Sequence, residues 1–364
     1  MKKEPLLNQY ALLNTVILSA EYLLRSSYPP SKSNNSIFYQ YTRTQALDAI
    51  LKSGSIWATN MKYLNDSLEY KSGIATIDSV YSKGKSAFNQ NVRKNLQTYS
   101  TQYNDDEFST FSTSFCEEGD LLSQWITYAK EGGVSIGFDF SIDNLYWGQK
   151  INDNFYRTNA MKYPLSVMYV PLNPNPQPED EHIRIIKKVI KNISSTGMTT
   201  DIEKLTYYML LCYIKNCDFK QEREHRIVSV PCVNSITSGK MKEYASEVKT
   251  MIQDSHVFRP YIELYPITKD DELANLPIAE IIVGPASNQN NIFKSIVYKL
   301  EHSYIEDIKI EIPSPEKYKE RKAKYKKLVR QITKRNPNID YRNIIHFCEP
   351  WGLIVKTSES SYVF

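Results

Sequence analysis

Short apolar runs with the composition of β-strands recur along the chain and are separated by segments of helical periodicity. No internal repeat interrupts this alternation. Some strand-like runs follow one another closely, as in a hairpin, whereas others are separated by a helix, as in a crossover connection. This mixture favours an α+β fold with a mixed or antiparallel sheet over a doubly wound α/β sheet.

The pattern predicts individual elements. The expected strands are 37–42, 55–59, 108–115, 134–140, 165–170, 226–230, 261–264, 278–283 and 305–312. The expected helices are 44–52, a helix carrying Trp125 and Tyr128, 179–194, 201–216 and 288–300. A stiff Asn-Pro-Asn-Pro-Gln-Pro linker at 173–178 precedes the third and fourth of these helices. We therefore expect a helical insertion at about 171–217.

These elements suggest three parts: an N-terminal helix at 1–35, an α+β catalytic-like domain at 36–312, and a basic helix with a C-terminal extension at 313–364. The apolar run 11–24 contains Asn14 and Glu21, so it is too short and too polar to span a bilayer. A signal peptide fits poorly because Glu4 directly follows Met-Lys-Lys and no A-x-A site follows Ala20. An amphipathic helix lying on the core fits better, with no membrane partner.

Several familiar sites are missing from the sequence. The five cysteines form no C-x-x-C pair, which argues against a disulfide framework and a structural zinc site and predicts a cytoplasmic protein. The chain has no G-x-G-x-x-G and no G-x-x-x-x-G-K-[ST] motif, so a Rossmann turn and a P-loop are excluded. It has no nucleophile elbow, and its five histidines are isolated, so we expect no resident metal.

The segment 220–231 concentrates two carboxylates and two guanidinium groups just before an apolar, strand-like stretch. On a strand, Glu222, Glu224 and Arg226 would point to one face, and Arg223 and His225 to the other. Two neighbouring carboxylates raise the pKa of one of them unless a cation relieves the repulsion, and Arg226 is the next cation on that face. We predict that Glu224 carries chemistry and that Glu222 assists it.

Positive charge is concentrated at 314–335, where ten Lys or Arg and two Glu give a net charge of +8, while the whole chain carries +4. Apolar side chains in this segment recur at helical spacing, which predicts a helix with a buried stripe and a cationic outer face. The stripe comprises Tyr318, Tyr325, Leu328, Val329 and Ile332. The outer face is either a solvated surface or a nucleic-acid contact through Lys322, Lys326 and Arg330.

Six short motifs follow one another between about residues 38 and 312. They are Asn-Asp-Ser-Leu-Glu at 65–69, Leu-Ser-Gln-Trp at 122–125 with Tyr-Ala at 128–129, Gly-Val-Ser-Ile-Gly-Phe-Asp at 133–139, Glu-Arg-Glu-His-Arg at 222–226, Pro-Tyr-Ile-Glu-Leu at 260–264 and Ile-Ile-Val-Gly-Pro at 281–285. In this order they resemble the bacterial family catalogued as domain of unknown function 2971. That family name implies no activity.

A more distant resemblance suggests a reaction. The chain has Tyr-Gln-Tyr-Thr-Arg at 39–43, Phe-Ser-Thr-Ser-Phe at 111–115 and Glu-Arg-Glu at 222–224. In type and order these segments resemble the motifs of mono-ADP-ribosyltransferases, which bind NAD without a Rossmann fold. The spacing from Ser114 to Glu224 is longer than that family usually shows, and the helical insertion can absorb the excess. The resemblance implies an ADP-ribosyltransferase-like core with NAD as a substrate.

The resemblance also implies roles for individual residues. Glu224 would stabilise an oxocarbenium-like ribose, and Glu222 would orient or deprotonate the acceptor. The cofactor-binding candidates are Tyr41 or Tyr128 stacking on nicotinamide, Thr42 or Ser112 holding a ribose hydroxyl, Ser114 on the same strand, and Arg43 pairing with the pyrophosphate. Asn65, Glu69, Trp125 and Arg226 are further pocket candidates. The open alternatives are a surface Arg43, a core stripe at Trp125 and Tyr128, and a turn at 65–66.

These observations predict an NAD-dependent ADP-ribosyltransferase or NAD glycohydrolase, acting as a bacterial toxin or phage-defence effector on a macromolecule such as nucleic acid, with a regulatory partner protein. One alternative is a nuclease whose Asp66, Glu69, Glu222 and Glu224 collect Mg²⁺ or Mn²⁺. It is less favoured because Arg226 stands where the commonest nuclease pattern has Lys. The other alternative is a non-catalytic module that binds nucleic acid or protein.

Overall fold

The computed structural model describes residues 19, 22, 24, 26, 36–64, 69–82, 86–104, 110–151, 154–156, 163–171, 181–195, 200–229, 248–252, 257–270 and 272–360. The chain forms two compact units, each assembled from three stretches. Unit 1 comprises Met1–Lys32, Trp57–Ser114 and Tyr146–Glu272, and unit 2 comprises Ser33–Ile56, Phe115–Leu145 and Leu273–Phe364. The predicted N-terminal helix lies almost entirely outside the described residues.

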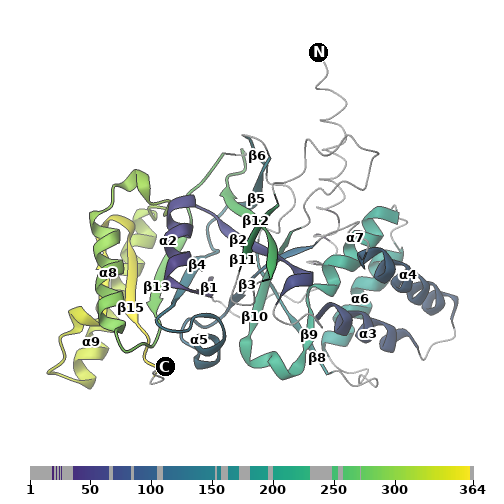
Figure 1. The fold of residues 1–364 in the computed structure, drawn as a ribbon, viewed down its shortest axis with the longest axis horizontal. Helices are drawn as coiled ribbons and strands as arrows, with labels where there is room; N and C mark the ends of the chain where they lie inside the picture. The colour runs from purple at the N-terminus through teal and green to yellow at the C-terminus, as the bar shows by residue number, and fades with distance from the viewer. Residues whose placement is uncertain are drawn as a thin grey trace, which may run out of the picture. The chain divides into compact units, whose positions relative to one another are not determined.

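Five strands form the sheet of unit 2, in the order β14-β15-β13-β4-β1 (Figure 1). They are β1 (Ile37–Thr42), β4 (Val134–Asp139), β13 (Ile278–Val283), β14 (Ile345–Cys348) and β15 (Leu353–Thr357). All neighbours are antiparallel except β13 and β15, which are parallel. The helices of unit 2 are α2 (Thr44–Ser53), α5 (Leu122–Tyr128), α8 (Gln289–His302) and α9 (Pro315–Arg335).

The hairpin of β14 and β15 receives a helix on each face. Ile345 and Phe347, two residues apart on β14, share one face and pack with α9. His346 points to the other face, where its Nε2 lies 2.6 Å from the Glu301 carboxylate of α8. The residues of α9 in this contact are Tyr318, Tyr325, Leu328, Val329 and Ile332, which confirms the predicted helix and shows that its apolar stripe is partly buried.

Unit 1 contains the strands β2 (Ile56–Asn60), β3 (Phe111–Cys116), β5 (Tyr146–Ile151), β6 (Asn154–Tyr156), β7 (Leu165–Ser166), β10 (Glu224–Ser229), β11 (Lys249–Ile252) and β12 (Phe258–Ile267). Ile56 of β2 and the last two residues of β3 belong to unit 2. The order is β3-β2-β12-β5-β6, while β10 pairs with β3 and β7, and β11 pairs with β12. A separate parallel pair joins β8 (Met168–Val170) to β9 (Ile214–Asn216).

The described helices of unit 1 are α3 (Glu69–Ser82), α4 (Ala87–Asn104), α6 (Glu181–Ser195) and α7 (Thr200–Leu211), with the 3₁₀ turns η1 (Met61–Tyr63) and η2 (Cys217–Glu222). The helices α6 and α7 lie where the sequence predicts a helical insertion. Together with the mostly antiparallel strands, they confirm a mixed α+β architecture. No helix among the described residues is long and apolar enough to cross a membrane.

Two predicted elements are wrong in type. The helix predicted over 201–216 ends at Leu211, and its last three residues form β9 alongside β8. The strand predicted over 305–312 begins instead with the 3₁₀ turn Ile305–Asp307 and keeps only an isolated bridge between Ile310 and Leu276. In the first case pairing with β8 overrides the helical pattern; in the second the apolar pattern forms no strand, because one bridge is its only ladder contact with the described residues.

Close packing around Gly119 in unit 2 leaves no room for a side chain. An added Cβ there would lie 2.4 Å from the Tyr39 ring and 2.7 Å from Ile282. We therefore expect Gly119→Ala to lower the free energy of unfolding by about 1–3 kcal/mol, because the buried ring cannot move without disturbing the sheet. Urea denaturation measures the loss, with Ser123→Ala on the exposed side of α5 as the control. Equal midpoints for both variants would contradict the packing described.

Candidate functional site

The charged segment of unit 1 folds back on itself before it becomes a strand. After α7, Ile214–Asn216 form β9, and the Asn216 side chain caps η2 by accepting a hydrogen bond from the Asp218 amide. Arg223 ends η2 in the left-handed conformation, with φ of 45°. Strand β10 begins only at Glu224. The prediction that Glu222 and Glu224 share one strand face is therefore wrong, because Glu222 belongs to the preceding turn.

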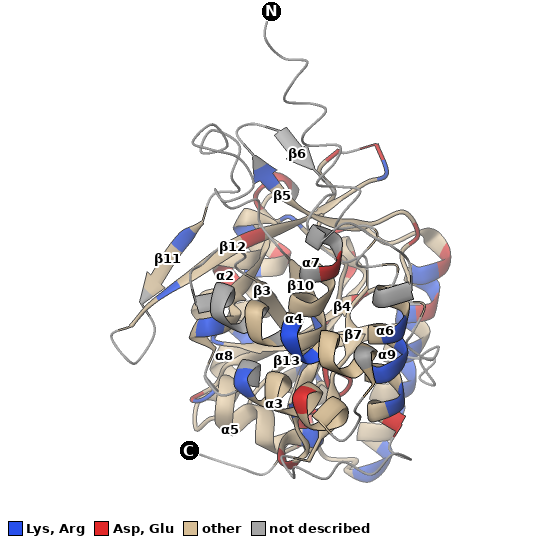
Figure 2. Ribbon diagram, turned by 90° about the vertical axis from the view of Figure 1, so that its right-hand side faces the viewer, with Lys and Arg blue, Asp and Glu red and all other residues tan. Residues whose placement is uncertain are grey.

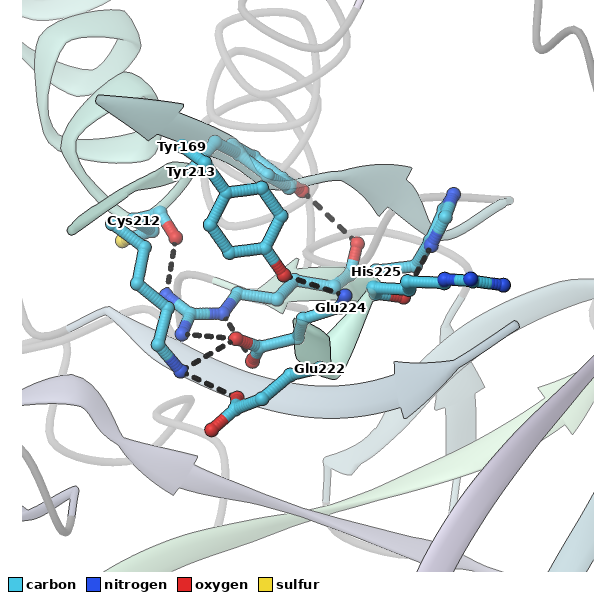
Figure 3. A network of polar contacts seen from close by, with 9 residues as sticks. Tyr169, Cys212, Tyr213, Glu222, Glu224 and His225 are labelled. Carbon is cyan, nitrogen blue, oxygen red and sulfur yellow. Dashed lines mark hydrogen bonds and ion pairs between the residues drawn. The ribbon is translucent and has the colours of Figure 1, made fainter. Parts of the chain in front are cut away.

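A lysine brings the two carboxylates together nonetheless. The Nζ of Lys215 lies 2.8 Å from Glu222 Oε2 and 2.9 Å from Glu224 Oε2 (Figure 3). The register of β8 and β9 places Lys215 opposite Tyr169, whose hydroxyl accepts a hydrogen bond from the Glu224 amide at 2.7 Å. The lysine and the strand end are thus fixed by the same pair of strands.

Arg226 completes the network from the other side. Its Nε donates to Glu224 Oε1 at 2.7 Å and its Nη2 to Oε2 at 2.9 Å, a bidentate pair. Its Nη1 donates to the Cys212 carbonyl, just past the C-terminus of α7, where a cation is favoured. The Tyr213 hydroxyl donates to the Arg226 carbonyl at 3.3 Å. All three guanidinium nitrogens therefore donate hydrogen bonds. Arg226 pairs with a carboxylate, as predicted, and that carboxylate is Glu224.

The cluster is buried and electrically balanced. Lys215, Glu224 and Arg226 are 3%, 6% and 1% exposed, and Glu222 is only partly exposed. Burial by itself raises the pKa of the Glu224 carboxyl, but Arg226 first, and then Lys215, outweigh it and hold that pKa at about 2. Glu224 is therefore a carboxylate at neutral pH, fixed in one orientation.

The Ser-Thr-Ser segment lies beside this carboxylate. Strand β3 pairs with β10, and the neighbouring Ser114 hydroxyl contributes to lowering the pKa of the Glu224 carboxyl. Ser114 is exposed, whereas Ser112, two residues earlier on the same side of β3, is buried and its hydroxyl has no hydrogen-bond partner among the described residues. The structure thus joins the middle and late segments of the predicted site.

Two aromatic candidates are core residues of unit 2. Tyr41 is 8% exposed; its hydroxyl donates to the Glu118 carbonyl and accepts from the Leu121 amide, at 2.9 and 2.8 Å. Its ring meets the fully buried Trp125 edge-on, with centroids 4.7 Å apart. The Trp125 indole donates to Asp120 at 2.7 Å. Both side chains therefore anchor the loop before α5. For Trp125 this agrees with the alternative interpretation, in which it is a core residue and not part of a pocket.

The remaining candidates lie at the surface or outside the described side chains. Tyr128 is exposed on α5, so it does not share the buried side of Trp125. Thr42 ends β1, and the exposed Arg43 is the N-cap of α2, its carbonyl accepting from the Ala46 and Leu47 amides. Asn65 lies outside the described residues, and only the backbone of Glu69, the first residue of α3, is described. The structure brings together Ser114, Glu222, Glu224 and Arg226 in unit 1; Tyr41, Thr42, Arg43, Trp125 and Tyr128 belong to unit 2.

Sequence reasoning missed Lys215 and Tyr169. Lys215 follows the long apolar run 205–214, and a lone charge that continues a buried run requires an opposite charge. That signal could have paired it with the two glutamates that follow. Tyr169 carries no comparable signal, because its contact with Glu224 depends on the parallel pairing of β8 and β9.

Residues 124–227 match the model of a known protein family. The family is described as Protein of unknown function (DUF2971). The match supports the resemblance to this family, and it includes the whole Lys215, Glu222, Glu224 and Arg226 cluster. No curated protein and no solved structure matches the chain, so the comparisons give no support to the resemblance to ADP-ribosyltransferases. The DUF2971 description assigns no activity to the segment.

Neutralising Glu224 should destabilise the protein. Glu224→Gln leaves Lys215 and Arg226 with only Glu222 as an anion, so we expect a loss of roughly 3–5 kcal/mol in the free energy of unfolding. The charge-balanced variant Lys215→Met/Glu224→Gln should recover part of it, because it removes the excess buried positive charge. Chemical denaturation measures both, and Asp48→Asn, at an exposed ion pair, should cost no more than about 1 kcal/mol. A Glu224→Gln loss as small as that of Asp48→Asn would refute the buried network.

The low pKa of Glu224 also predicts a pH dependence. Its carboxyl has a pKa of about 2 in the folded state against 4.5 in its ordinary state, so its contribution is complete above pH 4.5 and is lost as the pH falls towards 2. The wild type should lose on the order of 3 kcal/mol more than the charge-balanced variant over this interval. Urea titrations between pH 5 and pH 2.5 test this, and parallel curves would contradict it.

Proposed function

We propose that the Glu224 site breaks the nicotinamide–ribose bond of NAD and transfers the ADP-ribosyl group to a macromolecular acceptor. The observation that carries the proposal is the pairing of β3 with β10, which brings the exposed Ser114 beside an ionised, buried Glu224 whose pKa it helps to lower. A ribose hydroxyl can donate a hydrogen bond to such a carboxylate and accept one from such a serine hydroxyl. We propose that the protein acts as a bacterial toxin or phage-defence effector, because consumption of NAD harms the cell in which it occurs.

In the proposed reaction the C1′–N bond breaks and its electron pair leaves with nicotinamide. The ribose passes through an oxocarbenium-like state, whose positive charge the Glu224 carboxylate stabilises. A nucleophilic oxygen or nitrogen of the acceptor then attacks C1′ and loses its proton to Glu222. With water as the acceptor, the same steps hydrolyse NAD.

The ion pairs of Glu224 suit this role. Lys215 and Arg226 hold the carboxylate in one orientation, so no reorganisation is needed as charge develops on the ribose. Lys215 also ties Glu222 to the same position, 2.8 Å from the shared ammonium. The cluster has two anions and two cations, so an oxocarbenium beside Ser114 would meet no net positive charge.

The metal-dependent nuclease has less support. The Lys215 ammonium occupies the position between Glu222 and Glu224 where a divalent cation would bridge them. Among the residues that the structure describes, no group of three His, Cys, Asp or Glu side chains is placed to hold a metal ion. The NAD reaction uses the same carboxylates without requiring a metal.

The charge-balanced variant separates chemistry from stability. If Glu224 acts on NAD, Lys215→Met/Glu224→Gln should fold more stably than Glu224→Gln but release nicotinamide at least about 100-fold more slowly than the wild type. Chromatography of nicotinamide, together with transfer of label from NAD carrying labelled adenine to protein and nucleic acid, measures the activity. The same variant should relieve toxicity on expression.

Other results would reject the proposal. Wild-type protein that neither releases nicotinamide nor transfers label would do so, as would full activity in the charge-balanced variant. Metal-dependent cleavage of DNA or RNA without NAD would favour the nuclease instead. The Asp48→Asn variant, with its surface substitution, should keep wild-type activity and thus controls for preparation and assay.

A further inference from the structure

The cations of α9 fall into two groups. Those that face the rest of unit 2 form ion pairs: Lys317 and Arg321 with Asp139, Lys322 with Glu349, Lys324 with Glu280 and Arg335 with Glu359. Five others are exposed and form no ion pair with any residue that the structure describes: Lys319, which is followed directly by Glu320, and the group of Lys326, Lys327, Arg330 and Lys334. We call the last four residues the basic face.

The basic face is short and continuous. Its members span nine residues, or about 12 Å of helix, and Lys326, Arg330 and Lys334 follow one another at intervals of four residues, about 6 Å each. The segment 326–335 contains no acidic residue. Lys and Arg recur along α9 in Figure 2. Lys322, predicted for the outer face, lies instead over the Tyr318 ring and pairs with Glu349.

These four charges are not needed to hold α9 in place. The helix is fixed by its apolar stripe against β14 and β15 and by the buried contact of Arg321 with Asp139. Four like charges within 12 Å repel one another and create a local positive potential. Such a potential is favourable when it meets an equally dense row of negative charges.

We propose that the basic face binds the phosphate backbone of duplex nucleic acid without reading its sequence. Each strand of a duplex carries one negative charge per about 3.4 Å of its axis, close to the one cation per about 3 Å of this face. The proposal stands on α9 alone and is independent of the reaction proposed for Glu224.

Other occupants fit the face less well. An anionic lipid surface would attract these cations at about 1 kcal/mol each but would gain no inserted apolar side chains, because the apolar stripe of α9 is packed against β14 and β15. Single strands need exposed aromatic rings to stack on, and a protein partner needs apolar anchors. The exposed residues of 326–335 other than cations are Gln331 and Thr333, and neither is aromatic or apolar.

The test measures the salt dependence of binding to a fluorescent 20-base-pair DNA duplex by anisotropy, with the full-length protein. Four phosphate contacts predict a slope of log K against log salt of about −3.6, which is roughly a 150-fold loss between 50 and 200 mM. The variant Lys326→Gln/Lys327→Gln/Arg330→Gln should bind with a slope of about −0.9, roughly a fourfold loss over the same interval.

A matched control separates the basic face from net charge. Arg184→Gln/Lys187→Gln/Lys191→Gln removes the same three charges from the exposed side of α6, and its slope should stay at the wild-type value. Equal effects of the two triple variants would overturn the assignment, as would undetectable wild-type binding at 50 mM salt. Stronger binding to phosphatidylserine vesicles than to the duplex would overturn it too. If the first variant fails to fold by circular dichroism, Lys327→Gln/Lys334→Gln, expected to reduce the slope to about −1.8, replaces it.

Discussion

The buried cluster of Lys215, Glu222, Glu224 and Arg226 is the constraint on which unit 1 depends. Moving each charge out of water costs several kcal/mol, and the loss is offset only when every charge finds its partner in good geometry. Lys215 comes from β9, Glu222 from η2, and Glu224 and Arg226 from β10. The carbonyl of Cys212 and the hydroxyl of Tyr169 satisfy the groups left over. None of these elements can shift without exposing or unpairing a charge.

This constraint explains why the site has its shape. The left-handed Arg223 between η2 and β10 turns the chain so that both glutamates reach one ammonium. The pairing of β10 with β3 then places Ser114 against Glu224. In unit 2 the same rule sorts the charges of α9, since those facing the sheet are paired and those of the basic face are not. The Glu224 site consists of charges paired within the fold, whereas the basic face consists of charges that form no ion pair with the described residues.

The sequence predicted most where a periodic pattern was long. The α9 stripe follows from helical spacing alone, and the strand over 37–42 from its aromatic alternation. Prediction from the sequence failed where pairing between distant segments decided the secondary structure. Ile214–Asn216 continue an apolar run that reads as helix, yet β8 draws them into a strand. Glu222 precedes a strand-like run, yet the cap at Asn216 turns it into η2. Lys215 was missed although a lone charge after the buried run 205–214 indicates an ion pair, and its two partners reach it through the turn at Arg223.

The central claim is that Glu224 and Ser114 form a place for the ribose of NAD. Isothermal titration calorimetry of NAD into the full-length protein tests it most directly. Saturable binding at one site per chain is expected, and Ser114→Ala should weaken it severalfold through the loss of one hydrogen bond to the ribose. Absence of NAD binding to the wild type at millimolar concentration, or equal affinity of the two proteins, would contradict the account.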